Sequence, residues 1–245
     1  MLLKHRDPID SAQAVTLLSA ACRDACQYID IPIVRGFSGD APLYRLEGSQ
    51  GERQSRSTEH YYTVLMDEFL PHEGYPRRSA SIICGNWLNI EFAGEYGATY
   101  AIFPFDGVPI GVAYGRDFLE TRIAIHHFRQ RMALSILEWN QLFRSLGLRD
   151  ESYAAFTADI ERLRGKGGEI DALFPPGSNI GDVLRQIYSS SNMRLQIVTP
   201  ATIGTIQDRQ REMWFSGPCV AVRIDQLEAI KMSLKGLGKT VRRAR

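Results

Sequence analysis

Four polar side chains that could do chemistry lie where apolar runs of the sequence begin or end. Arg35 follows the β-branched run IPIV, and Ser79 and Ser81 alternate at the start of the run SIIC. Strand period 2 predicts that the two serines lie on the same face. Glu212 opens the run EMWFS. In each place a residue type that can bind or react stands at the edge of an expected strand whose other residues are apolar. If the chain brings these edges together, they form one site.

Each of these residues also has an ordinary structural use. Arg35 precedes a glycine and fits a turn with a surface ion pair, and strand-edge serines often bond the backbone. Glu212 has Arg209 and Arg211 as neighbours for an exposed ion pair. Residue type alone does not decide between the two uses.

The elements that must position these side chains follow from apolar periodicity. Helical spacing predicts helices over residues 11–28, 60–70, 88–96, 118–146, 152–163 and 180–188. Short apolar runs bounded by turn residues predict strands over residues 31–34, 81–84, 99–103, 194–199, 212–216 and 219–224. The polar stretch 45–59 predicts a loop. This order predicts an α+β domain whose helices pack on, or are inserted between, two small sheets.

Length and composition fit a globular protein. The chain has 245 residues, of which 44% are hydrophobic and 23% are charged, and a core of this size buries roughly 70 to 75% of the unfolded surface. Since no apolar run approaches the roughly 18 residues of a membrane span, we expect no membrane segment. The start MLLKHRDPID does not resemble a secretory signal. A cytosolic or virion-borne protein is therefore expected.

Cysteine and histidine spacing predicts no metal site. The four cysteines form no C-x-x-C pair and have no histidine at zinc spacing; they are Cys22, Cys26, Cys84 and Cys219. His126 and His127 are adjacent in a helical pattern, so their side chains would point about 100° apart and could not chelate together.

Charge is uneven along the chain. The formal net charge is +1, yet residues 231–245 hold six Lys or Arg and no acid, which leaves residues 1–230 net acidic. This basic C-terminal tail predicts a contact with nucleic acid or with an acidic partner. A solvated chain end is the alternative.

Several motifs together resemble ADP-ribosyltransferases with an Arg, Ser, Glu site, and in particular the phage-encoded proteins of that fold. The resemblance rests on Arg35-Gly36, on GYPRRSASIIC, on AGEYGATYAIFP, and on Gln210-Arg211-Glu212 before an apolar strand. It covers about a quarter of the chain. It implies a single ADP-ribosyltransferase-like domain over residues 1–230, built on two small packed sheets, with a helical insertion at about 117–170.

The same resemblance implies roles around NAD as the substrate. Arg35, with Gly36, would bind the diphosphate or ribose side, and Ser79 or Ser81 would hold the ribose or orient the glutamate. Glu212 would stabilise the oxocarbenium-like state as nicotinamide leaves, and Gln210 would help to choose the acceptor. The implied activity is transfer of ADP-ribose to a host macromolecule, in the host cytoplasm or from the virion.

Two features differ from the family pattern. The interval between Ser81 and Glu212 is longer than compact members need, and Ala80 stands where a threonine is usual. The rival hypothesis is a non-catalytic phage structural or virion-associated protein that retains the fold. A third is a nucleic-acid-binding module that uses the basic tail.

Overall fold

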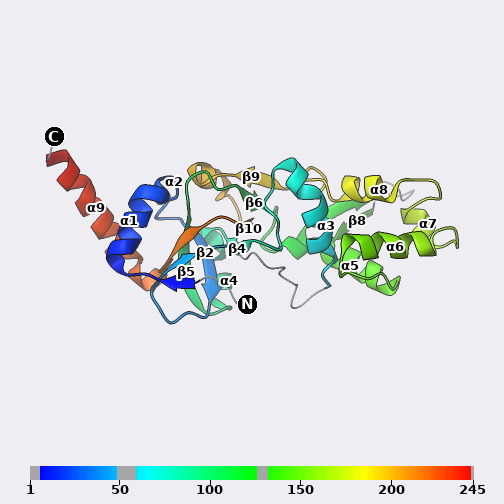
Figure 1. The fold of residues 1–245 in the computed structure, drawn as a ribbon, viewed down its shortest axis with the longest axis horizontal. Coiled ribbons are helices and arrows are strands. Elements are labelled where there is room, and N and C mark those ends of the chain that lie inside the picture. The colour runs from blue at the N-terminus through cyan, green and yellow to red at the C-terminus, as the bar shows by residue number, and fades with distance from the viewer. Residues whose placement is uncertain (1–5, 49–58, 126–131, 244–245) are drawn as a thin grey trace.

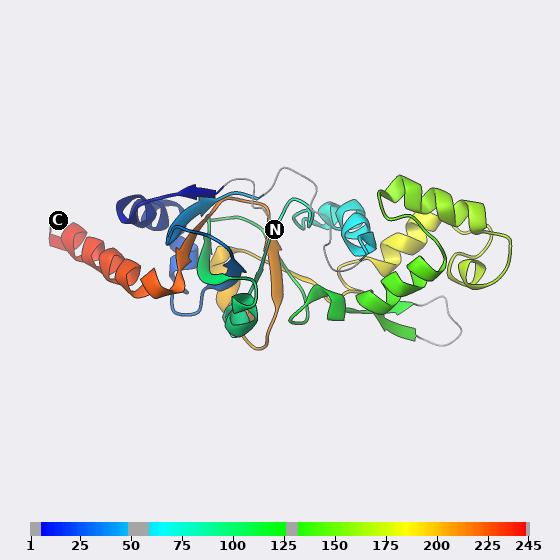
Figure 2. The same cartoon turned by 90° about the horizontal axis from the view of Figure 1, so that it is seen from below.

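The computed structural model describes residues 6–48, 59–125 and 132–243, without the side chains of residues 132 and 237–243. The molecule is elongated (Figure 1). A C-terminal helix projects at one end, a β-sheet occupies the middle, and a lobe of helices forms the other end (Figures 1 and 2).

One nine-stranded sheet, antiparallel throughout, organises the middle of the molecule. In spatial order its strands are β1 (Arg6–Pro8), β3 (Leu43–Leu46), β11 (Cys219–Arg223), β5 (Ala98–Pro104), β2 (Ile33–Phe37), β4 (Ile82–Gly85), β10 (Glu212–Phe215), β6 (Ile110–Val112) and β9 (Gln196–Val198). The α+β class is confirmed. The expectation of two small packed sheets is wrong, because the strands pair into one large sheet and the second sheet is a separate two-stranded hairpin.

The two faces of the large sheet bury different cores. On one face, here called the α1 face, strand residues such as Ala101 and Val220 pack against α1 (Ser11–Ala21), α2 (Arg23–Cys26) and α9 (Leu227–Arg243). On the opposite face, here called the η4 face, residues such as Ile33 and Cys84 pack with the 3-10 helix η4 (Pro200–Ile206). Strand alternation therefore decides which core each side chain enters.

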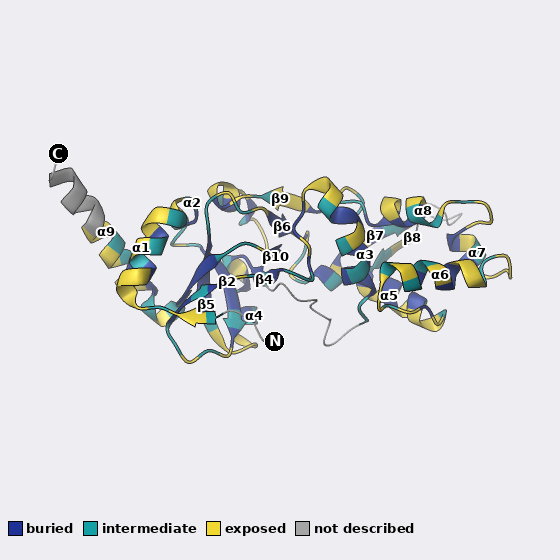
Figure 3. Cartoon of the chain, viewed as in Figure 1, coloured by how far each residue is buried: buried dark blue, intermediate teal, exposed yellow. Residues whose placement is uncertain are grey.

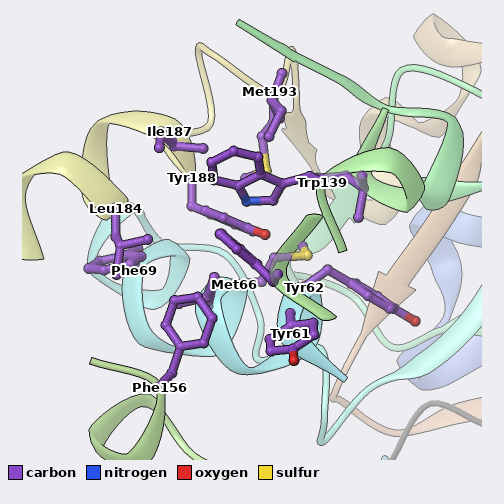
Figure 4. Close-up of a cluster of buried hydrophobic side chains, with 14 of the residues drawn as sticks. Tyr61, Tyr62, Met66, Phe69, Trp139, Phe156, Leu184, Ile187, Tyr188 and Met193 are labelled. Carbon is purple, nitrogen blue, oxygen red and sulfur yellow. The ribbon is translucent and has the colours of Figure 1, made fainter. Parts of the chain in front are cut away.

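A third core fills the helical lobe (Figure 4). Its helices are α3 (Tyr61–Phe69), α5 (Ile136–Ser145), α6 (Tyr153–Leu163), α7 (Glu169–Leu173) and α8 (Ile180–Ile187). Trp139 and Phe143 meet edge to face with ring centroids 4.3 Å apart. Between β6 and β9 the chain adds no strand to the large sheet among the described residues. The lobe thus combines α3, from the segment between β3 and β4, with an excursion between β6 and β9 that contains the 117–170 segment.

The remaining short elements connect these layers. They are η1 (Leu70–Glu73), η2 (Trp87–Asn89), α4 (Ile90–Gly94), η3 (Phe118–Glu120) and η5 (Ile224–Gln226). The helix expected over 11–28 begins as predicted, because Asp10 and Gln13 form a capping box. It is divided at Cys22 into α1 and α2.

The helix expected over 118–146 is wrong in its first half. Residues there form the 3-10 helix η3 and the hairpin of β7 (Arg122–Ile125) with β8 (Met132–Ser135), and of the described residues in this range only α5 is α-helical. The capping box between Ser135 and Glu138 fixes the start of α5. His126 and His127 lie outside the described residues. So does most of the loop expected over 45–59, whose first residues belong to β3.

The basic C-terminal tail is helical rather than a loose end. Helix α9 runs from Leu227 to Arg243, and Leu227 and Ile230 are buried against the sheet. Lys231 pairs with Asp30 at 2.8 Å and with Glu228 at 2.7 Å. No helix within the described ranges has the length and apolar character to cross a bilayer.

Asp159 carries a testable pH dependence of stability. This buried carboxylate of α6 accepts hydrogen bonds from the backbone N (3.0 Å), Nε (2.9 Å) and Nη2 (3.0 Å) of Arg149, and Arg162 Nη2 lies 3.3 Å away. Hydrogen bonds from Arg149 lower the pKa of Asp159 to about 2. A lowered pKa stabilises the fold above the unfolded pKa of about 3.9, and this contribution is lost as the pH falls through 2.

We therefore expect wild type to lose about 1 to 2 kcal/mol more than Asp159→Asn between pH 4 and pH 2, a range reduced because the arginine partners are exposed. Urea unfolding at several pH values measures this difference. Asp182→Asn, which removes an exposed pair with Arg185, is the control and should follow wild type. Parallel curves for wild type and Asp159→Asn would contradict the assignment.

Candidate functional site

The three strands that carry the predicted site residues are neighbours in the middle of the sheet. Strand β4 lies between β2 and β10. Val34 pairs with Gly85, and Glu212 pairs with the same Gly85 from the other side. The sequence motifs around Arg35, Ser81 and Glu212 are therefore brought together as strands. Whether their side chains meet depends on the register.

The register places Arg35 and Glu212 on opposite faces. Residues paired directly across antiparallel strands share a face, so Val34, Gly85 and Glu212 point to the α1 face. Arg35 is next to Val34 and points to the η4 face, because successive side chains alternate. The hydrophobic cores agree with this register. Ile33 and Phe37, which alternate with Val34 as Arg35 does, belong to the core of the η4 face. Trp214, on the same face of β10 as Glu212, packs in the helical lobe with Phe118, whose backbone N binds Glu212. The expected convergence of Arg35 with Glu212 is not found.

Arg35 is enclosed in the core of the η4 face. Its strand, β2, is largely coloured as buried in the middle of the molecule (Figure 3). Only 7% of Arg35 is exposed, and its Nη1 donates to the carbonyl of Ile83. Burial lowers the pKa of Arg35, and the neighbouring thiols of Cys84 and Cys219 partly oppose that effect. A guanidinium in this position supports the backbone of β4 and is not presented to a diphosphate.

Ser79 and Ser81 precede the strand instead of alternating along it. Strand β4 begins at Ile82, and the residues before it form a turn in which Ser79 N donates to Asp67 Oδ2 at 3.1 Å. The Ser81 hydroxyl donates to the carbonyl of Arg77 at 2.6 Å. The expectation that period-2 geometry puts both serines on one face is wrong. Because Glu212 pairs near the far end of β4, both serines lie away from it along the strand.

Gly36 and Gln210 have structural contacts of their own. A Cβ at Gly36 would stand 1.7 Å from the carbonyl oxygen of Ala93, so this glycine allows α4 to approach β2. Gln210 precedes β10 and is exposed, and its Nε2 donates to the carbonyl of Leu88 at 3.0 Å. Because Gln210 is outside the strand, two-residue spacing does not place it on the face of Glu212.

The partner of Glu212 is Arg78, a residue to which the sequence analysis gave no role. Arg78 Nη1 lies 2.5 Å from Glu212 Oε1, and the two side chains are only 4% and 12% exposed. The guanidinium carbon lies 5.2, 4.9 and 5.7 Å from the ring centroids of Tyr62, Phe118 and Trp214. Three cation–π contacts and one ion pair thus hold a buried cation.

Charge balance at this pair favours a permanently ionised arginine. Burial by itself lowers the pKa of Arg78, but the charge of Glu212, followed by Tyr62, outweighs it, and the pKa lies above its ordinary value. The second oxygen of Glu212, Oε2, accepts from the backbone N of Phe118 at 3.2 Å. Both oxygens of Glu212 are therefore engaged within the protein. To contact a ribose, the carboxylate would have to leave one of these partners.

A network of buried polar side chains fixes the segment that leads into β10. Asn86 donates to the carbonyls of Ile206 (3.1 Å) and Arg209 (2.6 Å) and accepts from Arg211 N (3.1 Å). Arg211 in turn binds Asp208 through Nε (3.1 Å) and Nη2 (2.9 Å). This network sets where β10 begins. The suggested ion pair between Glu212 and Arg211 is absent, since Arg211 pairs with Asp208.

Cys84, beside Arg35, is a buried thiol. Burial raises the pKa of Cys84 to about 12, which keeps the thiol protonated and weakly nucleophilic at neutral pH. Among the residues that the structure describes, no group of three or more His, Cys, Asp or Glu side chains is arranged to hold a metal ion.

Comparison of the chain with protein-family models, with curated proteins and with solved structures found no match. The functional argument therefore depends on the geometry of the described residues.

Proposed function

We propose that the protein is non-catalytic and that its Arg, Ser and Glu motifs hold the centre of the sheet together. The observation that carries this proposal is the register of β2, β4 and β10: Glu212 shares a face with its partner Gly85 and with Val34, whereas Arg35, next to Val34, points to the opposite face. A dinucleotide cannot contact both side chains from one surface while this register is kept. The proposal corresponds to a structural protein related to an ADP-ribosyltransferase-like core.

The contacts of the two charged residues support the same proposal. Arg35 binds a backbone carbonyl inside one core, and Glu212 neutralises Arg78 at the edge of another. In an NAD-binding site without its ligand, we would expect a guanidinium and a carboxylate that face solvent and have polar atoms available for the ligand. Here both groups already stabilise the protein.

NAD-dependent mono-ADP-ribosyl transfer to a host macromolecule is the second candidate function. It is favoured by one observation, the placement of the three motif-bearing strands side by side in the order β2, β4, β10. This activity would need Glu212 to leave Arg78 and Arg35 to leave the core. Both steps expose or unpair buried charge, which is costly.

An assay with NAD separates the two candidates. We expect purified protein to release no nicotinamide from labelled NAD above a blank without protein. Nicotinamide release would overturn the non-catalytic proposal and favour the transferase.

Residues 231–245 remain the proposed contact for nucleic acid or an acidic partner, in the host cytoplasm or the virion. Two features support this: the basic sequence, and the projection of α9 beyond the sheet (Figure 1). A groove of about 380 Å³ beside the first half of α9 has Leu18 and Leu234 in its wall. Its charged residues are Arg23, Lys235 and the ion-paired Asp30 and Lys231, so three cations face one carboxylate. Such a surface suits an amphipathic, acidic segment.

A further inference from the structure

Tyr114 is an exposed aromatic residue that two arginines approach. It lies between β6 and η3 and is 42% exposed. The guanidinium carbon of Arg209 is 4.7 Å from the centroid of its ring, and that of Arg194 is 5.5 Å away. The three residues come from three separate segments of the chain. Their convergence on one exposed ring is therefore a product of the fold.

The backbone conformation of Arg194 indicates a functional role for its side chain. Its φ of 54° is in the left-handed region, and Arg194 is the one non-glycine residue with positive φ among the described residues. Glycine adopts this conformation without strain, whereas a residue with a Cβ does not. Strained backbone of this kind concentrates at functional sites. An arginine kept at a position that glycine would fill more easily points to a use for its guanidinium.

The charges around Tyr114 leave an excess of positive charge. Asp208 engages Arg209 through Nε at 2.9 Å and is shared with the buried Arg211. Within the described part of the chain, no carboxylate forms an ion pair with Arg194. Arg209 and Arg211 therefore share one carboxylate and Arg194 adds a further positive charge, so that an anion placed beside the ring meets uncompensated positive charge.

A second arginine–aromatic pair adjoins the first. Arg116, two residues after Tyr114, lies with its guanidinium carbon 5.4 Å from the centroid of Phe92. The amide nitrogen of the buried Asn89 approaches the carbonyls of Arg116 at 3.5 Å and Arg211 at 3.0 Å, which ties this pair to the segment that carries Arg209. Alternating arginines and aromatic rings are typical of surfaces that bind nucleotides, because rings stack on bases and guanidiniums bind phosphates.

We propose that Tyr114, Arg194 and Arg209 form a nucleotide-binding site, in which a base stacks on the guanidinium plane of Arg209, supported by the tyrosine ring, and its phosphate binds Arg194. The ligand chemistry is a nucleobase joined to a phosphate, from a single-stranded nucleic acid or from a free nucleotide. This inference is independent of the non-catalytic proposal, because neither Arg35 nor Glu212 takes part.

Fluorescence anisotropy with a labelled single strand of thymidines, using the full chain, tests the site. Arg194→Gly is the sharpest variant, since it removes the guanidinium and relieves the strained backbone, so a folding defect is not expected. We expect Arg194→Gly and Tyr114→Ala each to weaken binding about tenfold. Arg194→Gly should also reduce the slope of log K against log salt by roughly 0.7 to 1.

Arg185→Ala is the matched control. Arg185 also lies over an aromatic ring, that of Phe69 at 5.7 Å, but in the helical lobe, and we expect its variant to bind as wild type does. Competition identifies the source of the ligand: displacement of the strand by AMP supports a free nucleotide, and resistance to AMP supports a nucleic acid. The proposal is overturned if wild type binds neither probe, if Arg194→Gly binds as tightly as wild type, or if inorganic phosphate at the same concentration as AMP displaces the strand.

Discussion

Replacing Glu212 with glutamine is expected to lower the free energy of unfolding by about 3 to 5 kcal/mol, because it leaves the buried charge of Arg78 without its counterion. Glutamine has nearly the same volume and still offers an oxygen to the backbone N of Phe118, now 3.2 Å from Glu212 Oε2. The loss therefore reports the charge and not a cavity. Denaturant unfolding at pH 7 measures it.

Two further variants make this result specific. Glu120→Gln removes an exposed pair with Arg116, whose side chains are 48% and 55% exposed, and should cost about 0 to 1 kcal/mol. In the double variant Arg78→Met with Glu212→Gln, neither of the two positions carries a buried charge, and methionine suits the surrounding aromatic rings. We expect the double variant to be more stable than Glu212→Gln alone. A double variant that is less stable would show that Arg78 stabilises the fold without its charge.

The same experiment distinguishes a structural from a catalytic glutamate. A catalytic glutamate without a buried counterion can usually be replaced by glutamine at small cost in stability. A glutamate that neutralises a buried arginine cannot, because the replacement leaves the arginine charge unpaired. The expected loss follows from Arg78, which is only 4% exposed. The sequence offers Arg209 and Arg211 as nearer partners, and an exposed pair with either would predict almost no loss.

Local signals in the sequence predicted many of the elements. Asp10 and Gln13 mark the start of α1, and the apolar runs after Ser81 and from Glu212 appear as β4 and β10. These elements depend on side chains a few residues apart, which a sequence displays directly. The hairpin of β7 and β8 was missed because its short strands continue into the apolar spacing of α5.

The candidate site was harder to predict because it depends on register. A shift of one residue in strand pairing moves every side chain to the other face, and no local pattern fixed the pairing of Val34 and Glu212 with Gly85. Arg78 was visible in the stretch PRRSAS, yet its role requires rings from α3, η3 and β10. A buried arginine before an apolar strand is a signal only when its distant partners are known.

Gly36→Ala is expected to destabilise the protein by about 3 kcal/mol, although it adds a single methyl group. The new Cβ would stand 1.7 Å from the carbonyl oxygen of Ala93 and 2.7 Å from its carbonyl carbon. Both atoms belong to the backbone of α4, so no side chain can rotate away, and the helix must move from β2. The resemblance to ADP-ribosyltransferases gave Gly36 a place in NAD binding, where its loss would affect ligand affinity and not folding.

Gly94→Ala is the control for this substitution, because Gly94 belongs to the same helix and the nearest atom to an added Cβ is Thr99 Oγ1 at 3.7 Å. Alanine is the better helix former, so this variant should be neutral or more stable by up to about 1 kcal/mol. Thermal and denaturant unfolding of both variants gives the comparison. If Gly36→Ala stays within about 0.5 kcal/mol of wild type, the close packing of α4 on β2 is refuted. The argument that Gly36 is structural would then be refuted as well, because that argument depends on the close approach of the two backbones, which requires glycine.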